Sequence, residues 1–265
     1  MEKLNSLARS LVLTTLFSSL VLVPTYADEI FSGNVKELTL QKFAAVDQDG
    51  KWEKGKQVLE KVSSCFDTDR HLVGGIIYNN DDTINTKITY MLDAQGNVKR
   101  VNTYNADGSD QTETYYWRDP EGKGKLTGIE EFGPYGDRYF ETAVTYDDAG
   151  KHYTTIYYSL AGKFDSKEIV DFDANDNAIR QIIYKTLDAN EKPSQTTVYE
   201  YDSKGCLTSL MQEGTADEVT RIEFTYEYDD QGNWITRMAW KVVTKDGDLT
   251  KTPITIESRT YIYYP

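Results

Sequence analysis

The residues of this sequence that could do chemistry are two histidines, two cysteines, many carboxylates and a tyrosine-rich set of aromatic side chains. Residues 171–177 begin like a calcium-binding loop, with oxygen-bearing side chains at alternate positions. An EF-hand loop also needs glycine at its sixth position and an acidic residue at its twelfth, where this segment has Asp176 and Ile182. We therefore interpret the segment as a turn, and we expect no metal and no cofactor.

The histidines and cysteines do not form a recognisable site. His71 and His152 are far apart in the sequence and lack the spacing of zinc ligands, so we expect them on the surface or in turns. Nothing near Cys206 in the sequence would activate its thiol. Paired carboxylates can hydrolyse glycosides, but here the aspartates recur regularly, as a structural role requires, and no single pair stands out. We assign no catalytic and no metal-binding residue.

The aromatic residues are the best candidates for binding. Tyr115 with Trp117, and Trp234 with Trp240, could form flat platforms on which sugar rings stack. The alternative is that these rings pack on the covered face of a sheet. The candidate ligand-binding residues are therefore Tyr115, Trp117, Trp234 and Trp240.

An internal repeat positions most of the polar residues. Seven aspartates recur at intervals of 26–29 residues, usually after an aromatic residue, and a turn residue follows three positions later. The aspartate side chain can accept hydrogen bonds from backbone N–H groups two and three residues ahead, and glycine supplies a positive φ. The repeat therefore predicts turns, at Asp67, Asp93 with Gly96, Asp119 with Gly122, Asp147 with Gly150, Asp173, Asp202 with Gly205, and Asp229 with Gly232.

Each repeat unit has the pattern of a β-hairpin. A looser polar turn, such as residues 79–82, lies between successive repeat turns, which leaves strands of roughly 7–10 residues. Residues 222–228 alternate apolar and polar side chains, and Trp234, Met238 and Trp240 should likewise share one face. We predict an all-β fold: an antiparallel meander of about 14–16 strands built from repeated hairpins, in an extended or partly curled sheet. The many charges on the strands argue against a membrane barrel.

The first 27 residues have the character of an export signal. Lys3 and Arg9 form a positive region, residues 11–23 are apolar, and Thr25 and Ala27 offer small side chains to a signal peptidase. We expect cleavage after Ala27 and a periplasmic or extracellular protein with no membrane span after cleavage.

Charge and sequence pattern then define the mature chain. Cleavage removes two positive charges and one negative charge, so the net charge changes from −14 to −15. Nucleic acid and anionic lipid surfaces would repel such a chain, and we expect no nucleic-acid partner. The predicted organisation is a signal peptide over residues 1–27, an N-terminal hairpin region over residues 28–62, and a repeat domain over residues 63–265.

Two cysteines permit one disulfide in an oxidising compartment. Cys65 precedes the first repeat turn and Cys206 follows the sixth, so in an open meander their thiols would be beyond bonding distance. We predict two free thiols, whereas a disulfide would require the sheet to close on itself.

The repeat resembles a known family. Residues 201–207 and 228–234 are similar to the Tyr-Asp-x-x-Gly-Asn/Arg-Leu core of YD (RHS-type) repeats, with weaker copies at residues 146–151, 66–67 and 172–173. The resemblance implies stacked hairpins in exported proteins that form shells or surface structures, sometimes tied to carbohydrate binding. The units here are longer than usual for that family, and the toxin domain of full RHS proteins is missing. The chain looks more like the small secreted YD-like proteins of Bacteroidota, whose functions are mostly unknown.

These observations lead to three functional hypotheses. The first is an exported, non-enzymatic binding or surface-structural protein, whose partner would be a glycan or an envelope or host protein. The second is a scaffold or assembly component that pairs with other chains through its edge strands. The third is a hydrolase that uses carboxylates.

Overall fold

The structure is a computed structural model that describes residues 31–119, 125–147, 149, 151–159, 161–175, 177–188, 192–214, 219–245 and 248–265. The regular elements within these ranges are all β-strands. In this part of the chain no helix is long and apolar enough to cross a membrane. The expected signal segment and the turn residues Gly122 and Gly150 lie outside the described residues.

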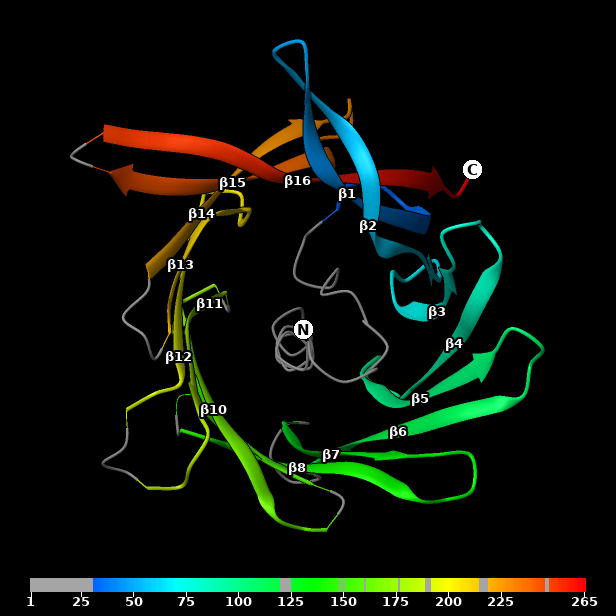
Figure 1. Cartoon of the computed structure of the whole chain (residues 1–265). Helices are drawn as coiled ribbons and strands as arrows, with labels where there is room; N and C mark the ends of the chain where they lie inside the picture. The colour runs from blue at the N-terminus through cyan, green and yellow to red at the C-terminus, as the bar shows by residue number, and fades with distance from the viewer. Residues whose placement is uncertain are drawn as a thin grey trace.

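Sixteen antiparallel strands follow one another in a meander, and the first strand pairs with the last, so that the sheet closes into a barrel (Figure 1). The all-β meander is confirmed, but the extended or partly curled sheet was only roughly right. Closure joins β1 and β16 from Val35↔Tyr263 to Ala44↔Thr255, which satisfies the backbone groups that an open sheet would leave unpaired at its edges. The strands are β1 (Val35–Gln48), β2 (Lys51–Phe66), β3 (Leu72–Tyr78), β4 (Ile84–Leu92), β5 (Val98–Asn105), β6 (Asp110–Arg118), β7 (Leu126–Phe132), β8 (Arg138–Tyr146), β9 (His152–Tyr158), β10 (Phe164–Phe172), β11 (Ala178–Tyr184), β12 (Gln195–Tyr201), β13 (Leu207–Gly214), β14 (Val219–Tyr228), β15 (Trp234–Lys245) and β16 (Asp248–Tyr263).

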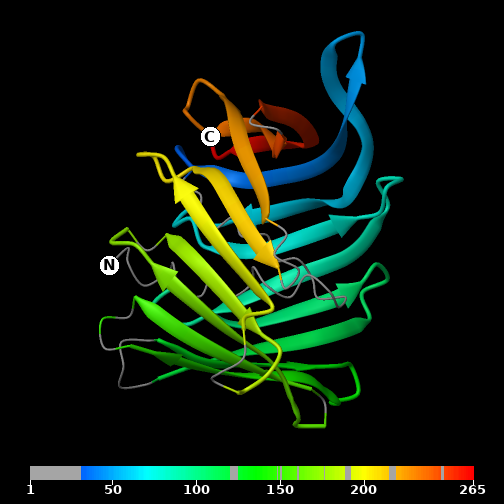
Figure 2. The same cartoon turned by 60° about the vertical axis from the view of Figure 1, so that its left-hand side comes forward.

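The repeat turns gather at one rim of the barrel. Because the strands of a meander alternate in direction, successive connections fall at opposite ends of the wall (Figure 2). All seven repeat turns follow even-numbered strands and therefore share one rim, here called the Asp-turn rim. The looser turns form the opposite rim, which we call the hairpin rim.

Five of the seven repeat turns have the geometry of three-residue hairpin loops. Asp93 Oδ1 accepts hydrogen bonds from the backbone N–H groups of Gln95 and Asn97, each at 2.9 Å. Gly96 has a φ of +81°, which suits the left-handed position of such a loop. The second donor thus lies four residues ahead, not three as expected, because the loop includes a bulged residue. Asp67, Asp173, Asp202 and Asp229 accept from the same two positions, while the N–H groups of Asp119 and Asp147 donate to the carbonyls of Lys125 and His152.

The residues that flank each repeat turn build an apolar ring inside the barrel. The residue before the aspartate pairs across the hairpin with a residue near the start of the next strand, and both side chains lie on the same face. That face carries the three clusters of buried apolar side chains, whereas the opposite face carries exposed charged residues. The buried face is the inner one, because side chains converge on the concave side of a cylinder. The pairs are Phe66↔Leu72, Leu92↔Val98, Arg118↔Leu126, Tyr146↔Tyr153, Phe172↔Ala178, Tyr201↔Leu207 and Tyr228↔Trp234.

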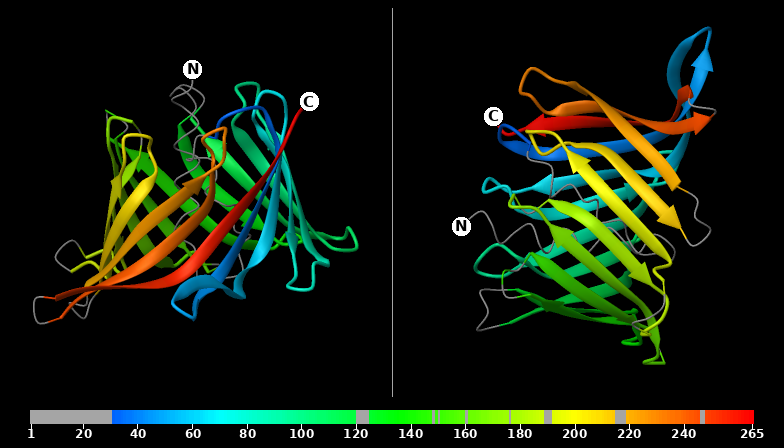
Figure 3. Two further views of the ribbon diagram at one scale, coloured as in Figure 1. Left: turned by 90° about the horizontal axis from the view of Figure 1, so that it is seen from above. Right: turned by 90° about the vertical axis from the view of Figure 1, so that its left-hand side faces the viewer.

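Two hairpins extend beyond the wall at the hairpin rim (Figure 3). The pairing of β2 with β3 begins only at Lys61↔Tyr78, so the outer part of β1–β2 is a two-stranded ribbon. The hairpin β15–β16 projects beside it. Lysines in residues 51–56 and Pro253 lie on these strands, and such residues discourage pairing with another chain. Strand β2 also runs across residue 62, so the N-terminal hairpin and the repeats belong to one sheet.

Cys65 and Cys206 are free thiols. Cys65 lies in β2, beside Glu37 of β1, and Cys206 precedes β13, where it accepts a hydrogen bond from the hydroxyl of Tyr228. Closure through β1 and β16 therefore does not bring the two thiols together.

Charged and amide side chains hold the closing seam. Glu257 of β16 is 7% exposed and pairs with Lys42 of β1 at 2.9 Å and with Arg237 of β15 at 2.5 Å. At the Asp-turn rim, the buried amide of Asn233 accepts from the N–H of Ser32 at 2.5 Å, and its Nδ2 donates to the Ser32 carbonyl and to the Tyr263 hydroxyl. The last repeat turn is thus hydrogen-bonded to the backbone just before β1.

The seam makes stability depend on Glu257. Burial alone would raise the pKa of this carboxyl, but the charges of Arg237 and Lys42 outweigh burial and lower the pKa below its ordinary value of 4.5. A lowered pKa stabilises the fold above that ordinary value, and the stabilisation is lost as the pH falls through the lowered one.

We expect Glu257→Gln to reduce the free energy of unfolding at pH 7 by about 2–3 kcal/mol, because it leaves two half-buried cations without their buried carboxylate. Urea unfolding at several pH values measures this effect. The loss should shrink only as the pH falls through the lowered pKa of Glu257, because the wild-type carboxyl is then protonated too. An equal loss of stability at all pH values would contradict the lowered pKa of Glu257.

Candidate functional site

Trp117 forms a flat, solvent-facing surface on the outer wall. Its side chain is 51% exposed on the outer face of β6, directly opposite Gly128 of β7. A Cβ at Gly128 would lie 3.9 Å from Cδ1 of the indole, and the indole N–H donates to Glu130 Oε2 at 2.7 Å. The Cδ1–Nε1 edge of the indole therefore lies toward β7, between Gly128 and Glu130, and about half of the residue stays exposed to solvent. We call Trp117, Gly128 and Glu130 the indole platform.

The neighbours of the indole platform hold it in place. Arg138 of β8 contacts Glu130 at 3.4 Å and Glu141 at 2.7 Å, so one guanidinium fixes two carboxylates. The ring of Tyr115 is nearly parallel to the indole, with an interplanar angle of 15° and a centroid distance of 6.1 Å. The edge of Phe132 packs against Tyr115 at 5.8 Å. This support is ready before any ligand arrives, which lowers the entropic cost of binding.

The platform combines an apolar face with charged hydrogen-bonding groups at its border. The exposed indole face offers apolar contact to a flat ligand such as a pyranose ring. Carboxylate and guanidinium groups beside it can accept from and donate to hydroxyl groups. The sequence brought Tyr115 and Trp117 together correctly, but it did not identify Gly128 or Glu130. A glycine in mid-strand next to an aromatic neighbour is the signal that could have found them.

The expected platform of Trp234 with Trp240 does not form. A register shift after Glu227, where Tyr228 pairs with Trp234, adds one residue to β15 and reverses which side chains face outward. Trp234 therefore points into the barrel, while Met238 and Trp240 point out. Trp240 is half-buried on the outer wall and donates its indole N–H to the Thr225 hydroxyl at 3.0 Å.

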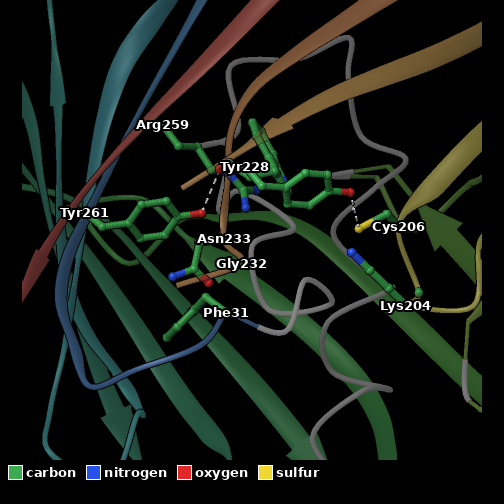
Figure 4. A pocket seen from close by; sticks show the side chains of 10 residues that line it. Phe31, Lys204, Cys206, Tyr228, Gly232, Asn233, Arg259 and Tyr261 are labelled. Atoms are coloured by element: carbon green, nitrogen blue, oxygen red, sulfur yellow. Dashed lines mark hydrogen bonds between the residues drawn. The ribbon is translucent and has the colours of Figure 1, made fainter. Parts of the chain in front are cut away.

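Trp234 is a structural residue of the inner wall. Its ring is 4% exposed, with the guanidiniums of Arg259 at 3.5 Å and Arg237 at 5.1 Å from its centroid. A cavity of about 30 Å³ lies beside it, bordered also by Tyr228 and Tyr261 (Figure 4). Such a volume holds about one water molecule and is too small for a sugar ring.

Comparison with known proteins supports the architecture. No family model and no curated protein matches this chain. A solved porin-like protein from Bacteroides uniformis is 13% identical, with a TM-score of 0.50, over 87% of this chain and 98% of that one. A porin-like protein from Bacteroides vulgatus is also 13% identical, with a TM-score of 0.36, over 88% and 99% of the two chains. The chain therefore shares its barrel fold with the protein from Bacteroides uniformis. The resemblance to YD repeats stays a prediction.

The interior of the barrel contains a polar network that the sequence did not reveal. Glu168 of β10 is 1% exposed, and it accepts hydrogen bonds from Tyr157 at 2.6 Å and from Gln181 at 2.7 Å. Tyr199 of β12 donates to Gln181 at 3.0 Å. Burial and the nearby charge of Glu168 raise the pKa of Tyr199 to about 12, so this hydroxyl stays protonated. Four consecutive strands are thus linked through side chains.

The two histidines lie beside repeat turns, as expected. His71 Nδ1 is 3.1 Å from Asp67, and His152 Nδ1 is 2.6 Å from Asp171, which also binds Arg180. Asp67, Asp69 and His71 offer ligand atoms within 4.8 Å of one another, the spacing that a metal ion requires. One oxygen of Asp67 is already occupied by the N–H groups of the turn, so this cluster is explained by turn geometry.

Glu131 is a buried carboxyl group on the inner wall of the barrel. This carboxyl is 7% exposed and its partner is the Thr114 hydroxyl at 3.3 Å. Burial raises the pKa of Glu131 above 4.5, and the Thr114 hydrogen bond offsets the rise only in part. A raised pKa means that the ionised carboxylate destabilises the fold at high pH, and that the penalty disappears below 4.5.

We expect Glu131→Gln to increase the free energy of unfolding at pH 7 by about 1 kcal/mol, since the amide has no charge to bury. The gain should vanish as the pH approaches 4.5, because the wild-type carboxyl is then neutral. Urea denaturation of wild type and variant at pH 7 and at pH 4.5 measures this difference in unfolding free energy. A variant that is less stable than wild type at pH 7 would show that the charge is needed.

Proposed function

We propose that this protein is an exported, non-enzymatic barrel that binds neutral glycans through the indole platform on its outer wall. The observation that carries the proposal is the position of Trp117, which covers a glycine, is fixed by Glu130, and still exposes 51% of its surface. A large aromatic side chain that is held rigidly and left open to solvent marks a binding surface.

The distribution of charge supports a wall that faces water. Charged outer residues occur in the middle of strands, for example Glu130, Lys167 and Glu223, and many form ion pairs on the outer face. The apolar clusters lie on the inner face. A membrane barrel has the opposite arrangement, with an apolar outer band and a polar interior. Together with the expected signal peptide, this favours a periplasmic or extracellular location in aqueous surroundings.

The environment of the carboxylates favours binding over hydrolysis. Glu130 and Glu141 are directly opposite each other on β7 and β8, as a pair of catalytic carboxylates could be. Both are paired with Arg138, and Glu130 also accepts the indole N–H of Trp117. Neither is placed in apolar surroundings of the kind that prepare a carboxyl group to donate a proton.

The glycan proposal predicts different results for two outer-wall tryptophans. The test is affinity electrophoresis of residues 28–265 against neutral β-glucan, xylan, mannan and starch. We expect Trp117→Ala to weaken binding by about tenfold or more, a loss of about 1.4 kcal/mol or more. Trp240→Ala is the matched control and should bind like wild type, because this half-buried indole lies on β15, away from the indole platform, and donates to Thr225. If no neutral polysaccharide retards the wild-type chain, the proposal fails.

The aqueous location has its own test. We expect the mature chain to purify without detergent as a single species, and to remain in the aqueous fraction when floated with phospholipid vesicles. The physical reason is that inserting the charged outer residues at the bilayer midplane would cost about 2–4 kcal/mol for each lysine or arginine. Spontaneous insertion into vesicles as a heat-resistant barrel would refute this location.

A further inference from the structure

We propose that the ligand of the indole platform is an oligosaccharide whose chain continues from Trp117 across β7, β8 and β9. This inference rests on the proposed function and specifies its ligand: a neutral glycan of at least three units that crosses the strands. It is carried by two parallel rows of side chains that the strand registers align on the outer wall.

The first row is a flat apolar track. Trp117 is directly opposite Gly128, Gly128 is opposite Ala143, and Ala143 is opposite Ile156. Directly opposite residues lie on a line across the strands, so these four form a continuous row on the outer face. Ala143 is exposed and Ile156 is half-buried. Three interstrand spacings make this track about 14 Å long, close to the length of a trisaccharide.

The second row, one step toward the hairpin rim, supplies polar groups. Tyr115 is opposite Glu130, Glu130 is opposite Glu141, and Glu141 is opposite Tyr158. Arg138 holds the two carboxylates at 3.4 and 2.7 Å. A sugar chain that lies with its apolar faces on the track would therefore turn the hydroxyl groups along one edge toward charged acceptors and a guanidinium.

Neighbouring residues bound the track toward both rims of the barrel. Toward the hairpin rim, the site is bounded by Tyr115 and by the edge of Phe132. Toward the Asp-turn rim, β6 ends at Arg118, whose side chain belongs to the inner wall. The direction across β7 and β8, which lie side by side in Figure 1, continues as a row of small and apolar residues.

Charge determines the class of sugar. The two rows contain two carboxylates, beside which Arg138 places one guanidinium, and the whole chain has a net charge of −14. Glycans that carry carboxylate or sulfate groups would be repelled, whereas neutral pyranose chains would not. Chains of equatorially linked units are flat enough to follow the track.

The experiment measures binding of cello-, xylo- and manno-oligosaccharides of one to six units by calorimetry and saturation-transfer NMR. For wild type, we expect the affinity in at least one series to rise by about tenfold or more from one to three units and then to level off. Ala143→Arg places a long charged side chain on the track and should abolish this gain while leaving single-unit binding within about twofold. Ile156→Arg should reduce the gain only from the third unit onward.

Met211→Arg is the matched control, because Met211 is also apolar, on the outer face, and 47% exposed, but lies on β13. It should bind every length like wild type. Equal affinity for all lengths in wild type, or length dependence unchanged in both Ala143→Arg and Ile156→Arg, would overturn the track while leaving the indole platform as a single-sugar site. Absence of binding to any oligosaccharide would instead mean that the proposed function itself fails.

Discussion

The pairing of β1 with β16 is the constraint on which the rest of the structure depends. A sixteen-stranded meander that stayed open would leave two long edges and would expose its apolar face. The seam prevents both, and its register is fixed by specific groups. Glu257 binds cations from the strands on either side, and Asn233 holds the backbone of Ser32 where the chain enters β1. The last repeat turn thereby contacts a segment of the chain that lies 201 residues earlier in the sequence, and this contact helps to close the barrel.

The repeat serves this architecture in two ways. In five of the seven units the aspartate closes a three-residue turn at one rim, and the bulge beside that turn directs a pair of side chains inward. The unit that departs most clearly from the repeat pattern is also the unit that carries the proposed binding site. Arg118 stands where other units have an apolar or aromatic residue, and next to it Trp117 faces outward onto Gly128. The proposed site thus lies at an irregular unit of an otherwise regular wall.

The parts of the fold that sequence could predict are those set by local interactions. Turns and strand alternation depend on neighbouring residues, so Tyr115 and Trp117, two positions apart in an unbulged stretch, were placed correctly on one face. Trp234 and Trp240 were not, because one additional residue after the turn reverses the alternation. Closure was missed for a different reason: it joins the first strand to the last, and no local pattern encodes that contact.

The porin-like fold and the charged outer wall are compatible because strand number and register determine whether a sheet closes, whereas side chains determine which solvent it faces. On β7 and β8, Ile129 and Val144 face inward and Glu130 and Glu141 face outward, which is the reverse of a lipid-facing wall at these positions. An outer wall that faces water can hold a solvent-exposed indole and paired ions, which a lipid-facing wall could not hold at the same depth. The proposed glycan site therefore requires that the charged outer face of these strands faces water.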